Sequence, residues 1–420
     1  MAFLDYPGLS RFKEKLDTAH DNLISSVSVR NDKDQSLTQT QISQVFANLG
    51  MIKRYGFKRE KNNSSCAGRI TYLYDAVGMA PAGMMFDAET GIGTFSYGDW
   101  EDFVNAIARP VMLKNDGTVD YELNHEDQAY KLDGVTASDV ANTSYAGNAM
   151  VEFGKAFKWV KRYEDENYEY VIFCDTQYDS TYHAYAHTND DGEVKDAFYI
   201  GMWAGPYVSS VLRSFGSGDA VAHSQSAEVE ITRAKANGNG YYILYKSAWD
   251  YISDLCTLIS KTDDSQAAFG TGVDSRLNSR QATGTLKNVG PFYGTNDGKS
   301  SMKVFWIVDY WGNMWQRLAG CVNVNGDVKC KMTGPYCDTP VSDADYSDYV
   351  SSGVTPSGTS GNLTKASQTT DDCGYLGKTA AGASNTYIPD SLYFNNNQVD
   401  FALVGAGYDT AADRAGARCL

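Results

Sequence analysis

Histidine side chains are the first candidates for metal or acid–base chemistry in this sequence. Two of them lie four residues apart, in the segment Tyr182-His183-Ala184-Tyr185-Ala186-His187. The alternation of side-chain types along this segment predicts a strand. On a strand, residues 183 and 187 share one face but lie two residue pairs apart, at about 7 Å per pair. That spacing is too long for two imidazoles to bind one zinc ion, and neither a third ligand nor an HExxH motif accompanies them. The sequence therefore predicts no metal site and no cofactor.

The eight cysteines are the other candidates for chemistry, and they are scattered without a CxxC pair. An even number is compatible with disulfides in an exported protein. The start of the chain, Met1 to Tyr6, has no basic region followed by an apolar run, so we expect no signal peptide. Buried free thiols are therefore the favoured interpretation. The sequence also contains no GxSxG elbow, no phosphate-binding loop and no complete EF-hand pattern.

Composition narrows the class of protein. The chain has 420 residues, enough for two or three domains, and 42% of them are hydrophobic, as in a globular protein. The 29 tyrosines and 39 glycines, against nine prolines, favour a β-rich protein with many turns. The net charge of −16 and the absence of a Lys/Arg cluster argue against a nucleic-acid partner. No apolar run reaches the roughly 18 residues that membrane insertion requires.

Two helices are expected at the N-terminus. In residues 8–28 the apolar side chains recur at spacings of three and four, as in a short heptad seam. This helix either packs on its own domain or serves in oligomerisation or docking. A second helix is expected to end near residue 50, and two capping boxes fit its start: Ser36 with Gln39, or Thr38 with Gln41. We therefore predict a helical module for docking or oligomerisation over residues 1–55.

Strand patterns dominate the rest of the chain. We predict a β-rich spacer over 56–147, with a strand at 69–74 and a hairpin that turns at Asn115-Asp116-Gly117. Two more hairpin turns are expected, at 189–192 and at Asn325-Gly326.

From residue 148 onward, strands alternate with two helices. The strands are expected at 150–153, 168–173 and 197–200. The helices have apolar faces formed by Ala227, Ile231 and Ala234, and by Trp249, Ile252, Cys256 and Ile259. Residues 338–390 are rich in Ser, Thr, Gly and Asp and predict a long surface excursion. The fold class predicted from this order is α+β.

Several short sequence motifs occur in a characteristic order along the chain. They are Phe3-Leu4-Asp5-Tyr6-Pro7-Gly8-Leu9, the stretches 112–121, 147–152 and 234–238, and finally Trp311-Gly312-Asn313-Met314-Trp315. In this order they resemble tail-fibre and related receptor-binding virion proteins of phages that infect gut bacteria. The last third resembles their C-type-lectin-like domain, which has the fold of formylglycine-generating enzymes. The resemblance implies such a domain over residues 148–420, with two helices and long loops.

In that group the receptor contacts lie near the C-terminus, and in some members a retroelement diversifies them by mutating adenines. The segment 405–418 is composed mainly of Tyr, Asp, Thr, Ala, Gly and Arg, which matches the composition of such diversified segments. The usual G-G-x-W motif of the group is here Gly405-Ala406-Gly407-Tyr408. The ligand-binding residues implied by the resemblance are Tyr408, Asp409, Thr410, Asp413 and Arg414. The tryptophans at 306, 311 and 315 are expected in the core, and Asn313 is expected to secure a turn.

The function implied by the resemblance is that of a phage receptor-binding protein, or adhesin, located on the virion. Its partners would be a host cell-surface glycan or protein, other virion proteins bound through the N-terminus, and two further copies in a homotrimer. The alternative is a purely structural head-fibre or decoration protein without a dedicated ligand. Formylglycine-generating enzymes use a close cysteine pair, but Cys330 and Cys337 are seven residues apart and are not in that family's C-x4-C context. We therefore expect no enzyme activity.

Overall fold

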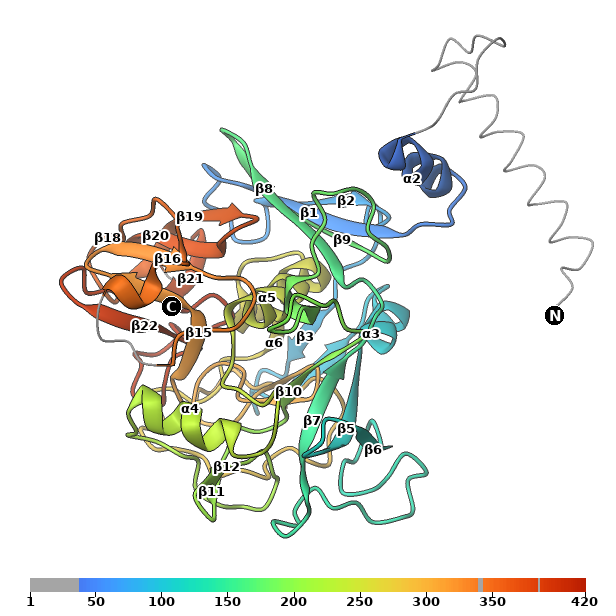
Figure 1. Cartoon of the computed structure of the whole chain (residues 1–420), viewed down its shortest axis with the longest axis vertical. Coiled ribbons are helices and arrows are strands. Elements are labelled where there is room, and N and C mark those ends of the chain that lie inside the picture. Colours follow the sequence, from blue (N-terminus) through green and yellow to red (C-terminus); the bar gives the residue numbers. More distant parts are fainter. Residues whose placement is uncertain (1–37, 339–342, 384–385) are drawn as a thin grey trace, which may run out of the picture.

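A computed structural model describes residues 38–338, 343–383 and 386–420 (Figure 1). The fold mixes helix and strand in several small sheets, which agrees with the predicted α+β class. Helix α5 (Lys246–Ser260) lies near the centre, and each of its residues is buried. It contacts strands from three different sheets. The predicted helical face from Trp249 to Ile259 is therefore confirmed, as part of a helix that is enclosed on all sides.

The first sheet has the strand order β2-β1-β9-β8, and all its pairs are antiparallel. Phe57 lies opposite Tyr72 on one side and Val171 on the other, and these buried side chains face the core. The strands are β1 (Arg54–Glu60), β2 (Ile70–Tyr74), β8 (Trp159–Glu164) and β9 (Tyr168–Cys174).

The second sheet has the order β10-β7-β5-β6. The predicted hairpin at Asn115-Asp116-Gly117 is confirmed, since it joins β5 to β6. The strands are β5 (Ala108–Lys114), β6 (Val119–Glu122), β7 (Gly147–Phe153) and β10 (Phe198–Gly201).

Both of these sheets combine strands from before and after residue 147. One large hydrophobic core also contains side chains from Phe57 through to Cys419. The predicted regions 56–147 and 148–420 therefore share two sheets and one core, and the boundary between them does not separate two packing units.

Two further sheets lie in the C-terminal part of the chain. The order of one is β17-β16-β15-β22, and its β15–β16 hairpin turns at Asn325-Gly326 as predicted. Its strands are β15 (Gln316–Val324), β16 (Asp327–Cys330), β17 (Val350–Ser351) and β22 (Val399–Val404). The order of the other is β18-β20-β19-β21, and its strands are β18 (Ser357–Gly358), β19 (Leu363–Thr370), β20 (Gly374–Gly382) and β21 (Ile388–Ser391).

The prediction of a surface excursion over 338–390 was therefore wrong. Strand β19 buries Ser367 and Thr369, whose hydroxyls donate to the buried Glu169 at 2.7 and 2.8 Å. Because the buried side chains are hydroxyls, this strand has no apolar periodicity.

Shorter elements complete the fold. Three two-stranded hairpins pair β3 (Gly83–Phe86) with β4 (Gly93–Ser96), β11 (Tyr207–Val208) with β12 (Val211–Leu212), and β13 (Lys303–Val304) with β14 (Ile307–Val308). The remaining helices are α3 (Glu101–Ile107), α4 (Ala227–Lys235), α6 (Ser265–Phe269) and the 3-10 turns η1 (Tyr185–His187) and η2 (Asp343–Tyr346). Helix α4 confirms the predicted face of Ala227, Ile231 and Ala234. No helix of the described part is long and apolar enough to cross a membrane.

Helix α2 (Gln39–Asn48) confirms the second predicted N-terminal helix. Thr38 and Gln41 form its capping box, which decides between the two expected starts. The helix projects from the rest of the protein in Figure 1. The Tyr178 hydroxyl donates a hydrogen bond to the Gln44 side chain at 2.6 Å and so connects the helix to the rest of the protein. The helix predicted for residues 8–28 lies outside the described residues.

Charged side chains are buried around α5. Asp254 accepts hydrogen bonds from Arg162 of β8, at 2.8 Å, and from Arg418, close to the C-terminus. Burial alone would raise the pKa of Asp254, but the two guanidinium groups hold it below its ordinary value. One turn earlier in the helix, Lys246 donates to both oxygens of Asp250 at 2.5 and 2.6 Å. These ion pairs fix the C-terminal segment and β8 to the central helix.

A second buried ion-pair group joins the first sheet to the loop after α5. Arg59 of β1 donates to both oxygens of Asp263 and to one oxygen of Glu169, each at 2.7 Å. All three side chains are at most 1% exposed, so each charge depends on its partners.

We expect the substitution Arg418→Leu to lower the free energy of unfolding by about 3 to 5 kcal/mol, because it leaves the buried Asp254 with one partner instead of two. Urea unfolding followed by circular dichroism measures the change. The matched control is Lys114→Met, which removes an exposed ion pair with Asp120 and should change stability little. Equal destabilisation by the two substitutions would contradict this account of Asp254.

Candidate functional site

The predicted ligand-binding residues lie on a loop whose two ends are buried. Residues 405–407 before it and 415–419 after it are buried, whereas Asp409, Ala411, Ala412 and Asp413 are exposed. Residues 408–414 are called the contact loop below. The structure therefore brings the predicted residues together at the surface, with the exception of Thr410.

Backbone hydrogen bonds hold the contact loop at both ends. Tyr408 N donates to Asn313 O at 3.0 Å, and Ser391 N donates to Arg414 O at 3.0 Å. In the middle of the loop, Ser275 N donates to Thr410 O at 2.9 Å. Three separate segments of the fold thus fix the path of the loop, so its exposed side chains start from a rigid base.

Asn313 supports the loop from below. It is fully buried, has a left-handed backbone with φ of 60°, and donates its side-chain amide to Asp309 at 2.7 Å. Its side-chain oxygen accepts from Gln281 N at 2.8 Å. The expectation that Asn313 secures a turn is therefore confirmed.

The tryptophans of this region divide into two kinds. Trp306 and Trp311 are fully buried, and their ring N–H groups donate to backbone carbonyls at 2.8 and 3.0 Å, so the core assignment is confirmed for both. Trp315 is only half-buried and meets Tyr393 edge to face, with 5.4 Å between ring centroids. Trp315 therefore has one side in the core and one side toward the surface.

The structure corrects the surface placement predicted for Thr410. This side chain is 4% exposed, and its hydroxyl accepts from Gly407 N at 3.0 Å. The hydroxyl closes a tight turn inside the loop, and this use of a threonine leaves no hydrophobic pattern in the sequence. Thr410 thus shapes the loop from within, at the edge of the groove that it helps to line.

Tyr408, Asp413 and Arg414 have partners at the protein surface. Tyr408 lies 4.5 Å from the Arg280 guanidinium, and Asp413 pairs with Arg276 at 2.9 Å. The Arg414 guanidinium donates to Gly361 O at 2.6 Å.

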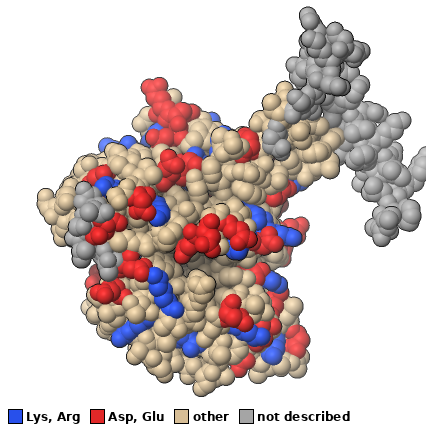
Figure 2. Space-filling model, viewed as in Figure 1, with Lys and Arg blue, Asp and Glu red and all other residues tan. Residues whose placement is uncertain are grey.

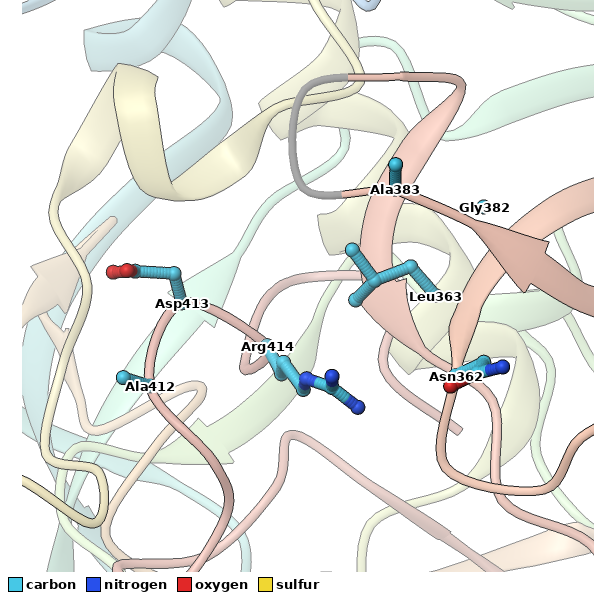
Figure 3. A pocket seen from close by; sticks show the side chains of 7 residues that line it. All are labelled: Asn362, Leu363, Gly382, Ala383, Ala412, Asp413 and Arg414. Carbon is cyan, nitrogen blue, oxygen red and sulfur yellow. The ribbon is translucent and has the colours of Figure 1, made fainter.

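A cavity of about 340 Å³ lies on one side of the contact loop, and Asp413 and Arg414 contribute to its lining. Figure 3 shows the Arg414 side chain extending toward Asn362, while the Asp413 carboxylate points away on the opposite side.

A larger groove of about 660 Å³ lies on the other side of the contact loop. It runs between β15, β22 and residues 392–398, and it is called the aromatic groove below. Its lining combines four aromatic rings with carboxylates and amides, among them Trp315, Tyr393, Phe394, Phe401, Asp400, Asp409, Asn323 and Gln398. Large rings with a few fixed polar groups are the usual composition of a binding site for a small or extended ligand.

Sequence reasoning missed the segment 392–398 as part of the site. The signal was present, because Tyr393-Phe394 is followed by Asn395-Asn396-Asn397, and aromatic residues beside amides are typical of binding loops. The segment lies between the excursion predicted for residues 338–390 and the contact segment 405–418 that the resemblance implies, and so belongs to neither.

The surface charge is mostly acidic. Figure 2 shows Asp and Glu side chains in clusters on the viewed face, with Lys and Arg side chains between them. Acidic side chains also enter the aromatic groove as Asp400 and Asp409. The lining also includes the Arg317 guanidinium, which pairs with Glu230 at 2.9 Å, so the groove contains charges of both signs.

The structure also corrects the strand predicted for residues 182–187. Tyr185–His187 form the 3-10 turn η1, because the Thr188 hydroxyl donates back to Ala184 O at 2.9 Å and closes the chain on itself. The predicted hairpin turn that follows, at 189–192, is flanked only by an isolated bridge between Thr188 and Val194.

The two histidines of this segment have separate surroundings. His183 lies 3.2 Å from the Asp371 carboxylate, whereas the buried His187 donates to Gly154 O at 3.0 Å. Burial lowers the pKa of His187 to about 4, so this imidazole is neutral at pH 7. Across the described residues, no group of three or more His, Cys, Asp or Glu side chains could hold a metal ion.

No protein-family model matches this sequence, and no curated protein matches it. The geometry of the contact loop and the aromatic groove is therefore the basis for the function proposed below.

We expect Asp309 to make stability fall as pH rises from about 4 to 6. Burial raises the pKa of this carboxyl to about 6, against about 3.9 in an unfolded chain, so the folded state binds the proton more tightly. In Asp309→Asn this fall is absent, and the free energy of unfolding of the variant relative to the natural protein should rise by about 2 kcal/mol across that range. Urea unfolding at pH 4, 5, 6 and 7 measures the difference.

The control for this titration is Asp87→Asn. The backbone N–H of Thr90 lowers the pKa of the exposed Asp87, so Asp87 contributes stability that is lost as pH falls through its folded pKa. Because that loss falls mostly below pH 4, the difference between Asp87→Asn and the natural protein should stay nearly constant from pH 5 to 7, unlike the difference for Asp309→Asn. A pH-independent difference for Asp309→Asn would contradict the raised pKa.

Proposed function

We propose that this protein is a phage virion receptor-binding protein, an adhesin that presents its C-terminal surface to a ligand on the host cell. The observation that carries the proposal is a rigidly held, exposed loop placed directly beside a large aromatic groove. The two features share Asp409, so one ligand can contact both.

The arrangement suits recognition of an external ligand. Tyr and Trp rings offer large contact areas and lose little conformational entropy on binding, while Asp, Asn and Gln offer adaptable hydrogen bonds. Tyr393 is 41% exposed although it packs on Trp315, so the ring is fixed and still accessible. A host surface glycan or protein is the class of partner that such a surface would meet.

The finer description of the fold belongs to the same proposal. Residues 148–420 would contain the C-type-lectin-like fold, completed by the strands from before residue 147 that share its sheets, and the order of two helices, α4 and α5, followed by strands and long loops supports this. Residues 1–55 would dock the chain to other virion proteins and assemble it as a homotrimer. Three weak sites on one particle would then bind with high avidity.

The first test measures binding of the full-length chain, fluorescently labelled, to a panel of gut bacterial isolates. We expect the double variant Tyr393→Ala, Asp409→Ala to bind at least about tenfold more weakly than the natural protein, because it removes a ring and a carboxylate from the groove. The variant Tyr408→Ala, Asp413→Ala tests the contact loop separately.

The matched control is Tyr130→Ala, Asp102→Ala, which removes one exposed ring and one exposed carboxylate far from these residues in the chain. It should bind as the natural protein does. Unchanged binding by both site variants would overturn the adhesin proposal for this surface and favour the structural head-fibre or decoration alternative.

The second test concerns the N-terminus. Removal of residues 1–37 leaves α2 and its bond to Tyr178 intact, so the body of the protein should fold as before. Phage particles that carry this deletion should lack the protein, while the purified truncated chain should still bind cells. Particles with a normal amount of the truncated protein would contradict a docking role for the N-terminus.

A further inference from the structure

The aromatic groove contains two acidic side chains that have no partner within the described part of the protein. Asp400 and Asp409 both line the groove, and neither carboxylate forms a hydrogen bond or an ion pair with a described residue. Asp409 is exposed and Asp400 is half-buried. An ionised carboxylate only accepts hydrogen bonds, so both groups are available to donors that a ligand brings.

The same groove holds an exposed ring in a fixed position. Tyr393 is 41% exposed and meets Trp315 edge to face, with 5.4 Å between the ring centroids. The backbone N–H of Tyr393 donates to Leu420 O at 2.8 Å, and the N–H of Phe394 donates to the Ser360 hydroxyl at 2.9 Å. Because the ring and its backbone are already held, a ligand that packs on Tyr393 has little to order.

Asn323 of β15 separates the groups that build the groove from those left for a ligand. Its side-chain amide donates to Asn395 O at 2.6 Å and to Gln398 O at 3.1 Å, and its side-chain oxygen accepts from Gly326 N at 3.1 Å. Asn323 therefore positions the segment 392–398. Asp400, which lies opposite Asn323 in the register of β15 and β22, has no such role.

The charges of the lining suit an uncharged ligand. Arg317 pairs with Glu230 at 2.9 Å and donates to Gln225 O at 3.1 Å, so its guanidinium already has partners inside the protein. A strongly anionic ligand would meet Asp400 and Asp409, and a strongly cationic one would meet Arg317. Hydroxyl groups can donate to the two carboxylates without bringing a net charge into the groove.

We propose that the aromatic groove binds a short, uncharged oligosaccharide. The C–H face of a sugar ring is slightly positive and packs on the negative face of an aromatic ring such as that of Tyr393. The sugar hydroxyls then donate to Asp400 and Asp409. The volume of about 660 Å³ lies within the range of roughly 300 to 1,000 Å³ that is usual for sites of small ligands. This inference rests on the proposed function, since the host surface is the source of the sugar.

An extended peptide is the alternative ligand that the test has to separate from a sugar. Strand β22 is at the edge of its sheet, and a peptide can add to a sheet edge as a further strand. Such a peptide is held mainly by its backbone, and this mode needs neither the exposed face of Tyr393 nor the two carboxylates. The composition of the groove therefore favours the sugar.

The test compares two treatments of the bacterial isolates that bind the full-length chain. Periodate cleaves the vicinal diols of sugars, whereas proteinase K removes surface proteins. We expect binding to fall at least about tenfold after periodate and to stay unchanged after proteinase K. Polysaccharide extracted from the same cells should bind the purified chain. Raising NaCl from about 0.1 to about 1 M should change this binding little, because the ligand is uncharged.

Substitutions at Tyr393 test whether the groove is the binding site. Tyr393→Ala should bind the extracted polysaccharide at least about tenfold more weakly, whereas Tyr393→Phe keeps the ring and should retain most of the binding. The matched control is Tyr130→Ala, because the Tyr130 side chain is 39% exposed and is not part of the groove lining. Equal binding by Tyr393→Ala and the natural protein would overturn the groove as the site of the sugar.

The treatments of the cells also separate the two proposals, and they use the natural sequence. Binding that survives periodate but is lost after proteinase K would overturn the oligosaccharide and identify a protein ligand, while the adhesin proposal would stand. If none of the isolates binds the untreated natural protein, the adhesin proposal fails, and the inference about the groove fails with it.

Discussion

The ion pairs of Asp254 with Arg162 and Arg418 are the interaction on which the rest of the structure depends. Asp254 lies on a helix with no exposed residue. The guanidinium groups of Arg162 and Arg418 therefore lose their hydration when they pair with it. Arg162 brings the first sheet to the helix, and Arg418 brings the end of the chain. Because the contact loop ends only four residues before Arg418, the position of the surface loop is set by a charge in the centre of the protein. Such ion pairs specify one arrangement more strongly than they add stability.

The base of the site shows the same use of costly polar groups. Asp309 is buried, and one of its carboxylate oxygens has no hydrogen-bond partner among the described residues. The other oxygen accepts from Asn313 and Ser301, at 2.7 and 3.2 Å. Asn313 in turn holds a left-handed turn and positions the start of the contact loop. Burying polar groups costs desolvation free energy that a purely apolar core would avoid. These polar residues are therefore better explained by the need to fix the direction of the loop than by a gain in stability.

The sequence predicted those elements whose signals are local. The capping box of α2, the apolar face of α4 and the Asn-Gly turn between β15 and β16 each occupy a few consecutive residues. Strand β19 was missed because its buried side chains are hydroxyls bonded to a distant glutamate, and Thr410 was misplaced because its partner is a backbone N–H within its own turn. The aromatic groove could not be predicted, since it forms only when β15, β22 and residues 392–398 meet. Patterns along the chain do not encode such contacts between distant segments.

The bonds of Glu169 also bear on how the protein is made. This carboxylate lies in β9, yet its hydroxyl donors Ser367 and Thr369 follow it by 198 and 200 residues. A ribosome adds about 5 to 20 residues per second, so Glu169 waits roughly ten seconds or more for these donors. Until then Arg59 of the same sheet is the partner that neutralises this acid. The core therefore closes only after Ser367 and Thr369 have been synthesised, and the nascent chain exposes unfinished sheet edges until then.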